Sequence, residues 1–380
     1  MKIKWVIFVV LTAFLILVIN SGSEAVNTRE VDLVRNKKIL DNQDLKIIDD
    51  FLAEAIQELV GTRDFTKIAQ IRTVILSRQS TQQAQYAQRF SESARKYIAA
   101  GFKQAEKLPR PDRTIGVTRN LLILMDGLQD LGLADLAMAM LKNENMVIRY
   151  WAVHCLTNPG IIKQLNAETE SNSNQASVIA GHLKELIETS TPEIVALIAR
   201  FAAAIKIPQA EQLLSQIADM RIKKYADWTV KYELYDRDLL NFLSSKIPLP
   251  SQSPGGPLPT TTNSNPPLAR RFAQLYSYAI QRYVKGAGLL NDTQKSHLAS
   301  VLVDTEDKCI GRLLGKPQLT IRRALERKNV QAILAEHDRL LGTAATPGQL
   351  PEILKFDYGT TPTDSKRNAP LPLPDPPAKK

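Results

Sequence analysis

The sequence is poor in the residues and motifs that carry catalytic or metal chemistry. Its 380 residues include only four histidines, and none lies within four residues of another, so no pair can bind a metal from one helix face. A G-x-S-x-G nucleophile elbow is absent from the sequence. Residues 311–317 resemble a phosphate loop, but the spacing is wrong and proline replaces the final Ser or Thr. The sequence therefore predicts no catalytic residue, metal or cofactor.

Cysteine is equally scarce, with Cys155 and Cys309 alone. Small secreted domains depend on several disulfides, but a chain of this length with 44% hydrophobic residues can bury a core without them. Cys155 lies in the apolar run 150–156, which indicates a buried thiol. The alternative is a single Cys155–Cys309 disulfide, which an oxidising compartment would permit.

Strand patterns are also missing, because no stretch alternates apolar and polar residues with β-branched enrichment. Aromatic residues make up only 6% of the chain. Apolar residues recur at helical spacing in residues 47–59, 65–75 and 86–102 instead. The sequence therefore predicts an all-α fold.

Proline is rare outside two segments and divides the chain. Fifteen of the 21 prolines fall in residues 247–267 and 346–380. The first segment carries no charge and predicts a flexible linker, and the second predicts a disordered Pro-rich tail. Two structured blocks remain, a helical-repeat domain at 26–246 and a small basic helical domain at 268–345.

The N-terminal segment has the order of a secretory signal. Lys2 and Lys4 precede the apolar run 5–19, and residues 23–25 form a small-x-small cleavage site. We therefore expect residues 1–25 to be a signal peptide that exports the chain to the periplasm or the cell exterior. If this segment is not cleaved, it would serve as an N-terminal membrane anchor.

The most informative internal pattern lies in residues 141–156, which resemble the turn and second helix of a HEAT repeat. In that family a Leu and two polar turn residues precede a V-R-x-x-A-x-x-A-L run. The matching positions here are Ile148, Arg149, Ala152, Cys155 and Leu156. Small residues in this pattern let the second helix pack closely against the helix before it.

A weaker copy of this pattern follows 47 residues later, at 195–203, which is within the period of HEAT and armadillo repeats. Between the copies, the polar stretch 166–177 indicates a loop insertion. A third helix pair is predicted at 209–218 and 221–240. The resemblance implies an irregular HEAT-like α-solenoid, and an ordinary helical bundle is the alternative.

Excess positive charge is concentrated in the predicted C-terminal domain. Residues 26–246 carry a net charge of +2, whereas residues 268–345 carry +6. A basic face there could meet an anionic polymer, lipid headgroups or an acidic partner, or it could be ordinary solvated surface. The basic residues are Arg270, Arg271, Arg282, Arg322, Arg323, Arg327 and Lys328.

A second candidate surface is aromatic. Tyr225, Trp228, Tyr232 and Tyr235 are three, four and three residues apart, a spacing that predicts one stripe on a helix. Such a stripe can bind a peptide or a glycan, or it can pack the last helix of an array. Either interpretation is compatible with the spacing.

Together these features predict an exported, non-enzymatic helical-repeat protein that acts as a protein-interaction scaffold. One alternative is an envelope-anchoring protein whose basic C-terminal domain binds anionic cell-wall or membrane surface. Another is a hydrolase on a helical scaffold, with catalytic residues brought together from distant repeats. Export disfavours nucleic acid as a partner, and no small-molecule substrate is indicated.

Overall fold

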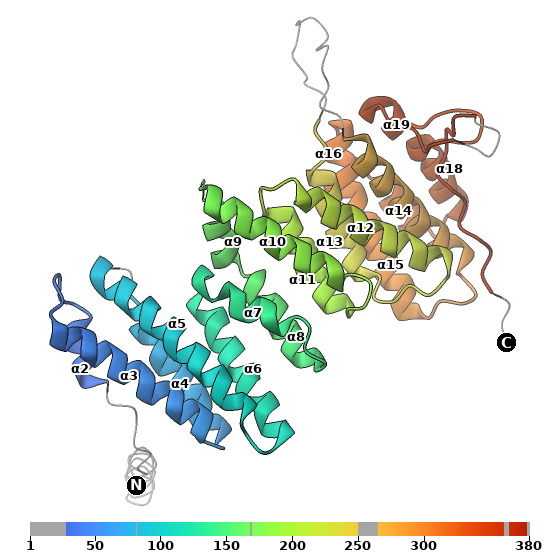
Figure 1. The fold of residues 1–380 in the computed structure, drawn as a ribbon. Helices are drawn as coiled ribbons and strands as arrows, with labels where there is room; N and C mark the ends of the chain where they lie inside the picture. The colour runs from blue at the N-terminus through green and yellow to red at the C-terminus, as the bar shows by residue number, and fades with distance from the viewer. Residues whose placement is uncertain (1–27, 81, 168, 250–264, 361–364, 378–380) are drawn as a thin grey trace, which may run out of the picture. The chain divides into compact units, whose positions relative to one another are not determined.

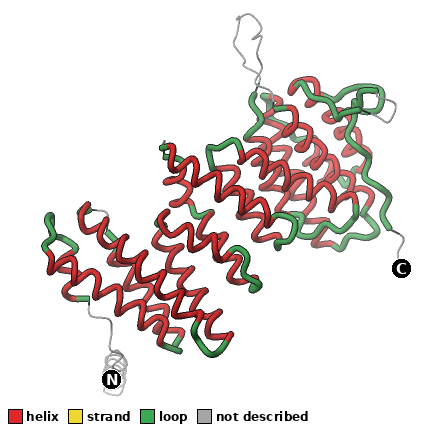
Figure 2. Tube along the Cα trace, viewed as in Figure 1, coloured by secondary structure: helices red, strands yellow, loops and turns green. Residues whose placement is uncertain are grey.

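The computed structural model describes residues 28–80, 82–167, 169–249, 265–360 and 365–377, and these are built from helices joined by loops (Figures 1 and 2). Their only strand-like pairings are two isolated antiparallel bridges, Gly342 with Pro347 and Thr360 with Lys366. The predicted all-α fold class is thereby confirmed. No helix in these described ranges has the length and apolarity that a bilayer crossing requires. The predicted signal segment lies outside the described residues.

The helices of the chain fall into two compact units, the first ending at Leu136 and the second beginning at Ala137. The structure thus divides the chain at a different place from the predicted linker at 247–267, whose central residues 250–264 lie outside the described ranges. The helix that follows this segment is largely buried, and it packs against α12 (Gln209–Ala226) and α13 (Leu234–Ser245), which precede it, as well as against later helices. Its apolar surface therefore joins the predicted C-terminal domain to the end of the predicted repeat block.

The first unit consists of antiparallel helices whose predicted positions at 47–59, 65–75 and 86–102 are confirmed. Helix α3 packs against α4 and α5, and α6 packs against both α4 and α5. Asp41 and Asp44 form a capping box at the start of α3, which satisfies two backbone N–H groups. The helices are α2 (Arg29–Val34), α3 (Asn42–Gly61), α4 (Phe65–Arg78), α5 (Ala84–Glu106) and α6 (Pro111–Leu128).

The second unit is a larger helical array. A 3₁₀ turn (Leu131–Leu133) and α7 (Ala134–Met140) lead into it. Its helices are α8 (Met146–Leu156), α9 (Pro159–Leu165), α10 (Glu170–Leu186), α11 (Pro192–Ala204), α12 (Gln209–Ala226), α13 (Leu234–Ser245), α14 (Pro266–Lys285), α15 (Asp292–Thr305), a π-helical turn (Glu306–Ile310), α16 (Gly311–Leu314), α17 (Thr320–Glu326), α18 (Val330–Leu341) and α19 (Gln349–Leu354).

Most of these helices are arranged in two rows (Figure 1). In one row α10 contacts α12, α12 contacts α14, and α14 contacts α18. In the other row α8 contacts α11, α11 contacts α13, and α13 contacts α15. Contacts of α11 with α12 and of α13 with α14 join the rows. Stacked antiparallel helix pairs produce this arrangement, in which each pair is buried mainly by its neighbours.

The segment that resembles a HEAT repeat forms a turn followed by helix α8, which ends at Leu156. Asn145 caps α8 by accepting the N–H groups of Val147 and Ile148. The guanidinium of Arg149 donates to the carbonyls of Asn143 and Glu144, so it closes the preceding turn. Ala152 is among the residues that α8 buries. Membership of the HEAT family itself stays a prediction.

Two expectations around these helices were wrong. The polar stretch 166–177 is not a loop insertion, because α10 begins at Glu170 and keeps its polar side chains outward while Ala176 is buried. The predicted helix at 221–240 is instead the end of α12, a turn at 227–233 and the start of α13. The alternative of a Cys155–Cys309 disulfide is also excluded, since both thiols are buried without bonding to each other.

The predicted disorder of the tail was wrong for its described residues, 346–360 and 365–377. Residues 349–354 form α19, and Leu373 is buried. Proline-rich chain has few N–H groups, so few need partners when the chain is extended along a protein surface. Glutamine side chains of α14 accept the N–H groups of Leu371 and Leu373.

A buried carboxylate next to the π-helical turn predicts a pH effect on stability. Glu306 is almost fully buried and accepts the N–H groups of Ile321 and Arg322. Burial raises the pKa of Glu306 above its ordinary value of 4.5, and these hydrogen bonds only partly oppose the rise. The folded state therefore holds this proton more tightly than the unfolded state does.

The contribution of Glu306 to stability is accordingly present below pH 4.5 and is lost as pH rises through the raised pKa. We expect the wild type to lose stability relative to Glu306→Gln across this window, because the amide does not ionise. Urea unfolding of both proteins from pH 4.5 upwards measures the difference. A stability difference that is constant with pH would contradict this assignment.

Candidate functional site

A recess in the second unit lies between the end of α8, α9 and α11. Its volume is about 590 Å³, which lies within the range of ligand-binding clefts. The described residues that line it are His154, Thr157, Asn158, Pro159, Ile162, Lys163, Asn166, Leu197, Arg200, Ala204 and Lys206.

Two asparagines hold the walls of this recess in place. Asn158 caps α9 by accepting the N–H of Gly160 at 2.9 Å. The amide of Asn166 donates to the carbonyl of Ala204 at 3.0 Å and accepts the N–H of Lys206 at 2.9 Å. This double contact ties the end of α9 to the end of α11, so residues 40 positions apart form one rim.

The rim of the recess is positively charged. Lys163, Arg200 and Lys206 all belong to its lining, and none of the described lining side chains is acidic. Outside the lining, Asp238 lies 3.9 Å from the Arg200 guanidinium. The Arg200 side chain is 61% exposed, so this long contact leaves most of its charge facing solvent. The recess therefore favours an anionic ligand.

Apolar and aromatic side chains extend this surface along α8. Ile162 and Leu197 contribute apolar area inside the recess. Beside it, the ring of His154 lies 5.2 Å from Trp151 and 5.8 Å from Tyr150, measured between centroids. Aromatic faces next to cationic groups are typical of surfaces that bind peptides.

The four predicted aromatic residues do not lie on one helix. Tyr225 belongs to α12 and Tyr235 to α13, whereas Trp228 and Tyr232 lie in the turn between these helices with φ angles of 57° and 56°. The spacing of three, four and three residues is that of a helix, but the backbone leaves the helical conformation between Tyr225 and Tyr235. Side-chain spacing alone does not show where a helix ends. The expectation of a single helical stripe was wrong.

These aromatic residues also have different surroundings. Tyr225 is buried, and its hydroxyl donates to Asp236 at 2.7 Å. Burial raises the pKa of Tyr225 well above its ordinary value, and the Asp236 charge adds to the rise. Tyr232 is 55% exposed and lies 6.2 Å from Tyr235 between ring centroids. Of the four, Tyr232 is the exposed residue, and Tyr235 beside it is half-buried.

The predicted basic residues on α14 are engaged in ion pairs. Arg270 donates to the backbone carbonyl and carboxylate of Asp357, at 2.6 and 2.9 Å. Arg271 makes a two-pronged contact with Asp219, with both distances at 2.8 Å. Because these acids offset their charges, neither arginine adds strongly to a positive surface.

The remaining basic residues lie on and just after α17. Arg322 is 3.7 Å from Asp307. Arg323, Arg327 and Lys328 are exposed, and the structure assigns their side chains no ion pair with a described residue. The predicted basic set is therefore divided between α14 and the region of α17, and part of it is offset by acidic residues.

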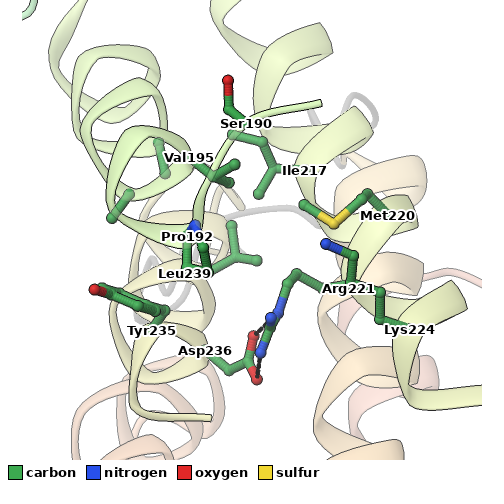
Figure 3. A pocket seen from close by; sticks show the side chains of 12 residues that line it. Ser190, Pro192, Val195, Ile217, Met220, Arg221, Lys224, Tyr235, Asp236 and Leu239 are labelled. Carbon is green, nitrogen blue, oxygen red and sulfur yellow. Dashed lines mark hydrogen bonds and ion pairs between the residues drawn. The ribbon is translucent and has the colours of Figure 1, made fainter. Parts of the chain in front are cut away.

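A smaller cavity lies beside the turn between α12 and α13 (Figure 3). Its volume is about 30 Å³, enough for about one water molecule. Figure 3 shows Arg221 and Asp236 next to one another in its wall, joined by two hydrogen bonds of 2.7 Å. This network binds α12 to α13, and the space beside it is too small for an organic ligand.

The recess depends on residues that the sequence pattern did not single out. Lys163, Arg200 and Lys206 come from two helices and the segment after one of them. The available signal was a basic residue following the second helix of each predicted repeat copy, at Lys163 and Lys206. The contact made by Asn166 and the packing of α8 against α9 and α11 bring these residues together.

Comparisons with known proteins identify no family. No family model matches this chain, and no curated protein is significantly similar to it. The function must therefore be argued from the surfaces themselves.

Proposed function

We propose that this protein is an exported, non-enzymatic interaction scaffold, and that the recess between α8, α9 and α11 binds an acidic segment of a protein partner. The observation that carries the proposal is the combination of three cations with apolar walls in one recess, without a described acid in the lining. Export rests on the sequence of residues 1–25, which has the order of a signal peptide.

Several features support a protein segment as the ligand. The aromatic group of Tyr150, Trp151 and His154 lies on the same helix that lines the recess, so a longer ligand would contact both. The rows of helices provide a fixed surface, which limits the ordering cost of binding. An acidic segment with apolar residues would complement both the cations and the walls.

A second candidate function is binding to an anionic cell-wall or membrane surface. It is favoured by the exposed Arg323, Arg327 and Lys328, which lie within six residues of one another. A cluster of this size attracts anionic surfaces weakly and in a salt-dependent way. Charge reversal at α17 separates this candidate from the first.

We expect a photo-crosslinking amino acid at Leu197 to capture a protein partner in intact cells. Leu197 is half-buried in the recess wall, so a bound segment would contact it. Val178, exposed on α10 outside the recess lining, is the matched control position.

The combined substitution Lys163→Glu and Arg200→Glu should reduce the captured product at least tenfold, because about 1–2 kcal/mol is expected for each partly desolvated charge contact.

The control charge reversal is Arg323→Glu with Arg327→Glu. Under the scaffold proposal it leaves crosslinking at Leu197 unchanged. Equal capture at Leu197 and Val178, or insensitivity to the recess charges, would reject the recess as the binding site. Loss of cell-envelope association with the α17 reversal alone would favour the second candidate function.

A further inference from the structure

The C-terminal segment is bound along α14 as an extended strand of proline-rich chain. Residues 365–377 approach α14 near Gln274 and leave it near Lys285, so the segment runs parallel to the helix. Figure 1 shows this segment as the red trace that leads to the C-terminus beside α14 and α18. Its sequence from 370 to 374 is Pro-Leu-Pro-Leu-Pro.

Two glutamines of α14 bind the backbone of this segment. Gln274 accepts the N–H of Leu371 at 2.8 Å and donates to the carbonyl of the same residue at 3.1 Å. Gln281 accepts the N–H of Leu373 at 2.7 Å and donates to the Leu371 carbonyl at 3.5 Å. A primary amide is both donor and acceptor, so each glutamine can pair with a backbone as a neighbouring strand would.

The carbonyls of Leu373 and Pro374 are also bound. Lys285 donates to the Leu373 carbonyl at 2.6 Å, and the indole N–H of Trp228 donates to the Pro374 carbonyl at 3.0 Å. The Arg282 guanidinium lies 5.3 Å from the Trp228 ring and so supports it from behind. The left-handed backbone of Trp228 is part of the turn that presents this indole to the tail.

The side chains of the segment match this arrangement. Pro370, Pro372 and Pro374 have no N–H, so the only backbone donors in this stretch are those of the two leucines, and both are bound. Leu373 is 1% exposed and is the apolar anchor. Recognition of extended proline-rich ligands uses the same elements, an aromatic residue, polar donors and an apolar pocket.

We propose that this groove, defined by Trp228, Gln274, Gln281 and Lys285, is a binding site for extended proline-rich peptides of a partner protein, and that the chain's own tail occupies it. Apart from the contact of Lys285 with the Asp375 carboxylate, the bonds made by Gln274, Gln281, Lys285 and Trp228 go to backbone atoms. An extended segment with the same proline spacing and a buried leucine can therefore make these backbone bonds. A tethered tail competes at an effective concentration in the millimolar range, so a partner gains access when the tail leaves. The groove shares no residue with the recess and stands independently of the proposed function.

The test uses the full-length chain carrying Leu373→Arg, which expels the tail by placing a charge at its buried anchor. The probe is a fluorescein-labelled synthetic peptide with the sequence of residues 368–377, and binding is followed by fluorescence anisotropy. We expect this variant to bind the peptide at least tenfold more tightly than the wild type does, because the competing tail is gone. Adding Gln274→Ala and Gln281→Ala should weaken binding at least tenfold, whereas Gln212→Ala on α12 should have no effect.

Equal peptide affinity of the wild type and Leu373→Arg, or no effect of the two glutamine substitutions, would overturn the proposal. A second measurement covers the case in which Leu373→Arg does not fold. A protease site is inserted at 361–364 of the wild-type chain, the chain is cleaved, and native mass spectrometry follows the tail fragment. Exchange of that fragment for excess labelled peptide supports a peptide site, and a fragment that cannot be exchanged identifies the tail as a fixed part of the fold.

Discussion

Replacing Asp236 by alanine will lower the free energy of unfolding by about 3–5 kcal/mol, because it leaves a buried guanidinium without its counter-ion. Asp236 is fully buried and Arg221 nearly so, and two hydrogen bonds of 2.7 Å join them. Burial by itself lowers the pKa of Arg221, but the charge and hydrogen bonds of Asp236 raise it above its ordinary value. The guanidinium therefore stays charged in the fold and needs this carboxylate.

Urea unfolding followed by circular dichroism measures the loss. The matched control is Asp238→Ala on the same helix, where a 39% exposed carboxylate contacts Arg237 and Arg200 at 3.3 and 3.9 Å. That control should cost about 0–1 kcal/mol, because water screens exposed ion pairs. If both substitutions have the same effect, Asp236 does not hold α12 and α13 together.

Replacing Arg282 by alanine is expected to have a similar effect, again about 3–5 kcal/mol. Its guanidinium is 3.2 Å from Glu233, and both side chains are almost fully buried. The same group lies 5.9 Å from the Tyr225 ring and 5.3 Å from the Trp228 ring. Its removal leaves a buried carboxylate uncompensated and takes away the cation that supports Trp228.

A double-mutant cycle separates the effect of the uncompensated Glu233 carboxylate from the effect of removing the cation beside Trp228. The Nε and Nη1 atoms of Arg282 are buried without a hydrogen-bond partner in the described structure, so its own burial is incompletely compensated. The pair Arg282→Met with Glu233→Gln should therefore be less destabilising than Arg282→Ala. Arg271→Ala, an exposed ion pair on the same helix, is the control and should cost about 0–1 kcal/mol. Equal losses for the single and double variants would contradict a role for the uncompensated carboxylate.

The helices were predictable from the sequence because their signals are local. The HEAT-like segment shows this clearly, since Asn145 supplies the cap, Arg149 closes the turn, and the helix ends at Leu156 as expected. Residues 47–59 similarly showed the helical period that α3 follows. Each of these features depends on residues within a few positions of one another.

The candidate binding surfaces were only partly predictable. Arg270 and Arg271 were singled out for their charge, but Asp357 and Asp219, distant in sequence, offset them. Lys163 and Lys206 carried no distinctive pattern, and they line one recess because Asn166 ties two helix ends together. Charge counts along a sequence do not show which acids will be neighbours in space.

The sequence by itself determined that this chain would form helices of these approximate positions, because apolar periodicity and helix caps act over a single turn or two. Only the tertiary structure decided where helix α12 ends, because the turn at 227–233 is held by Arg221, Asp236, Arg282 and Glu233. The tertiary structure also determined that the proline-rich tail binds along α14. Its composition predicts a chain without hydrogen-bond partners, but Gln274 and Gln281, 97 and 92 residues away from Leu371 and Leu373, accept the N–H groups of these two leucines.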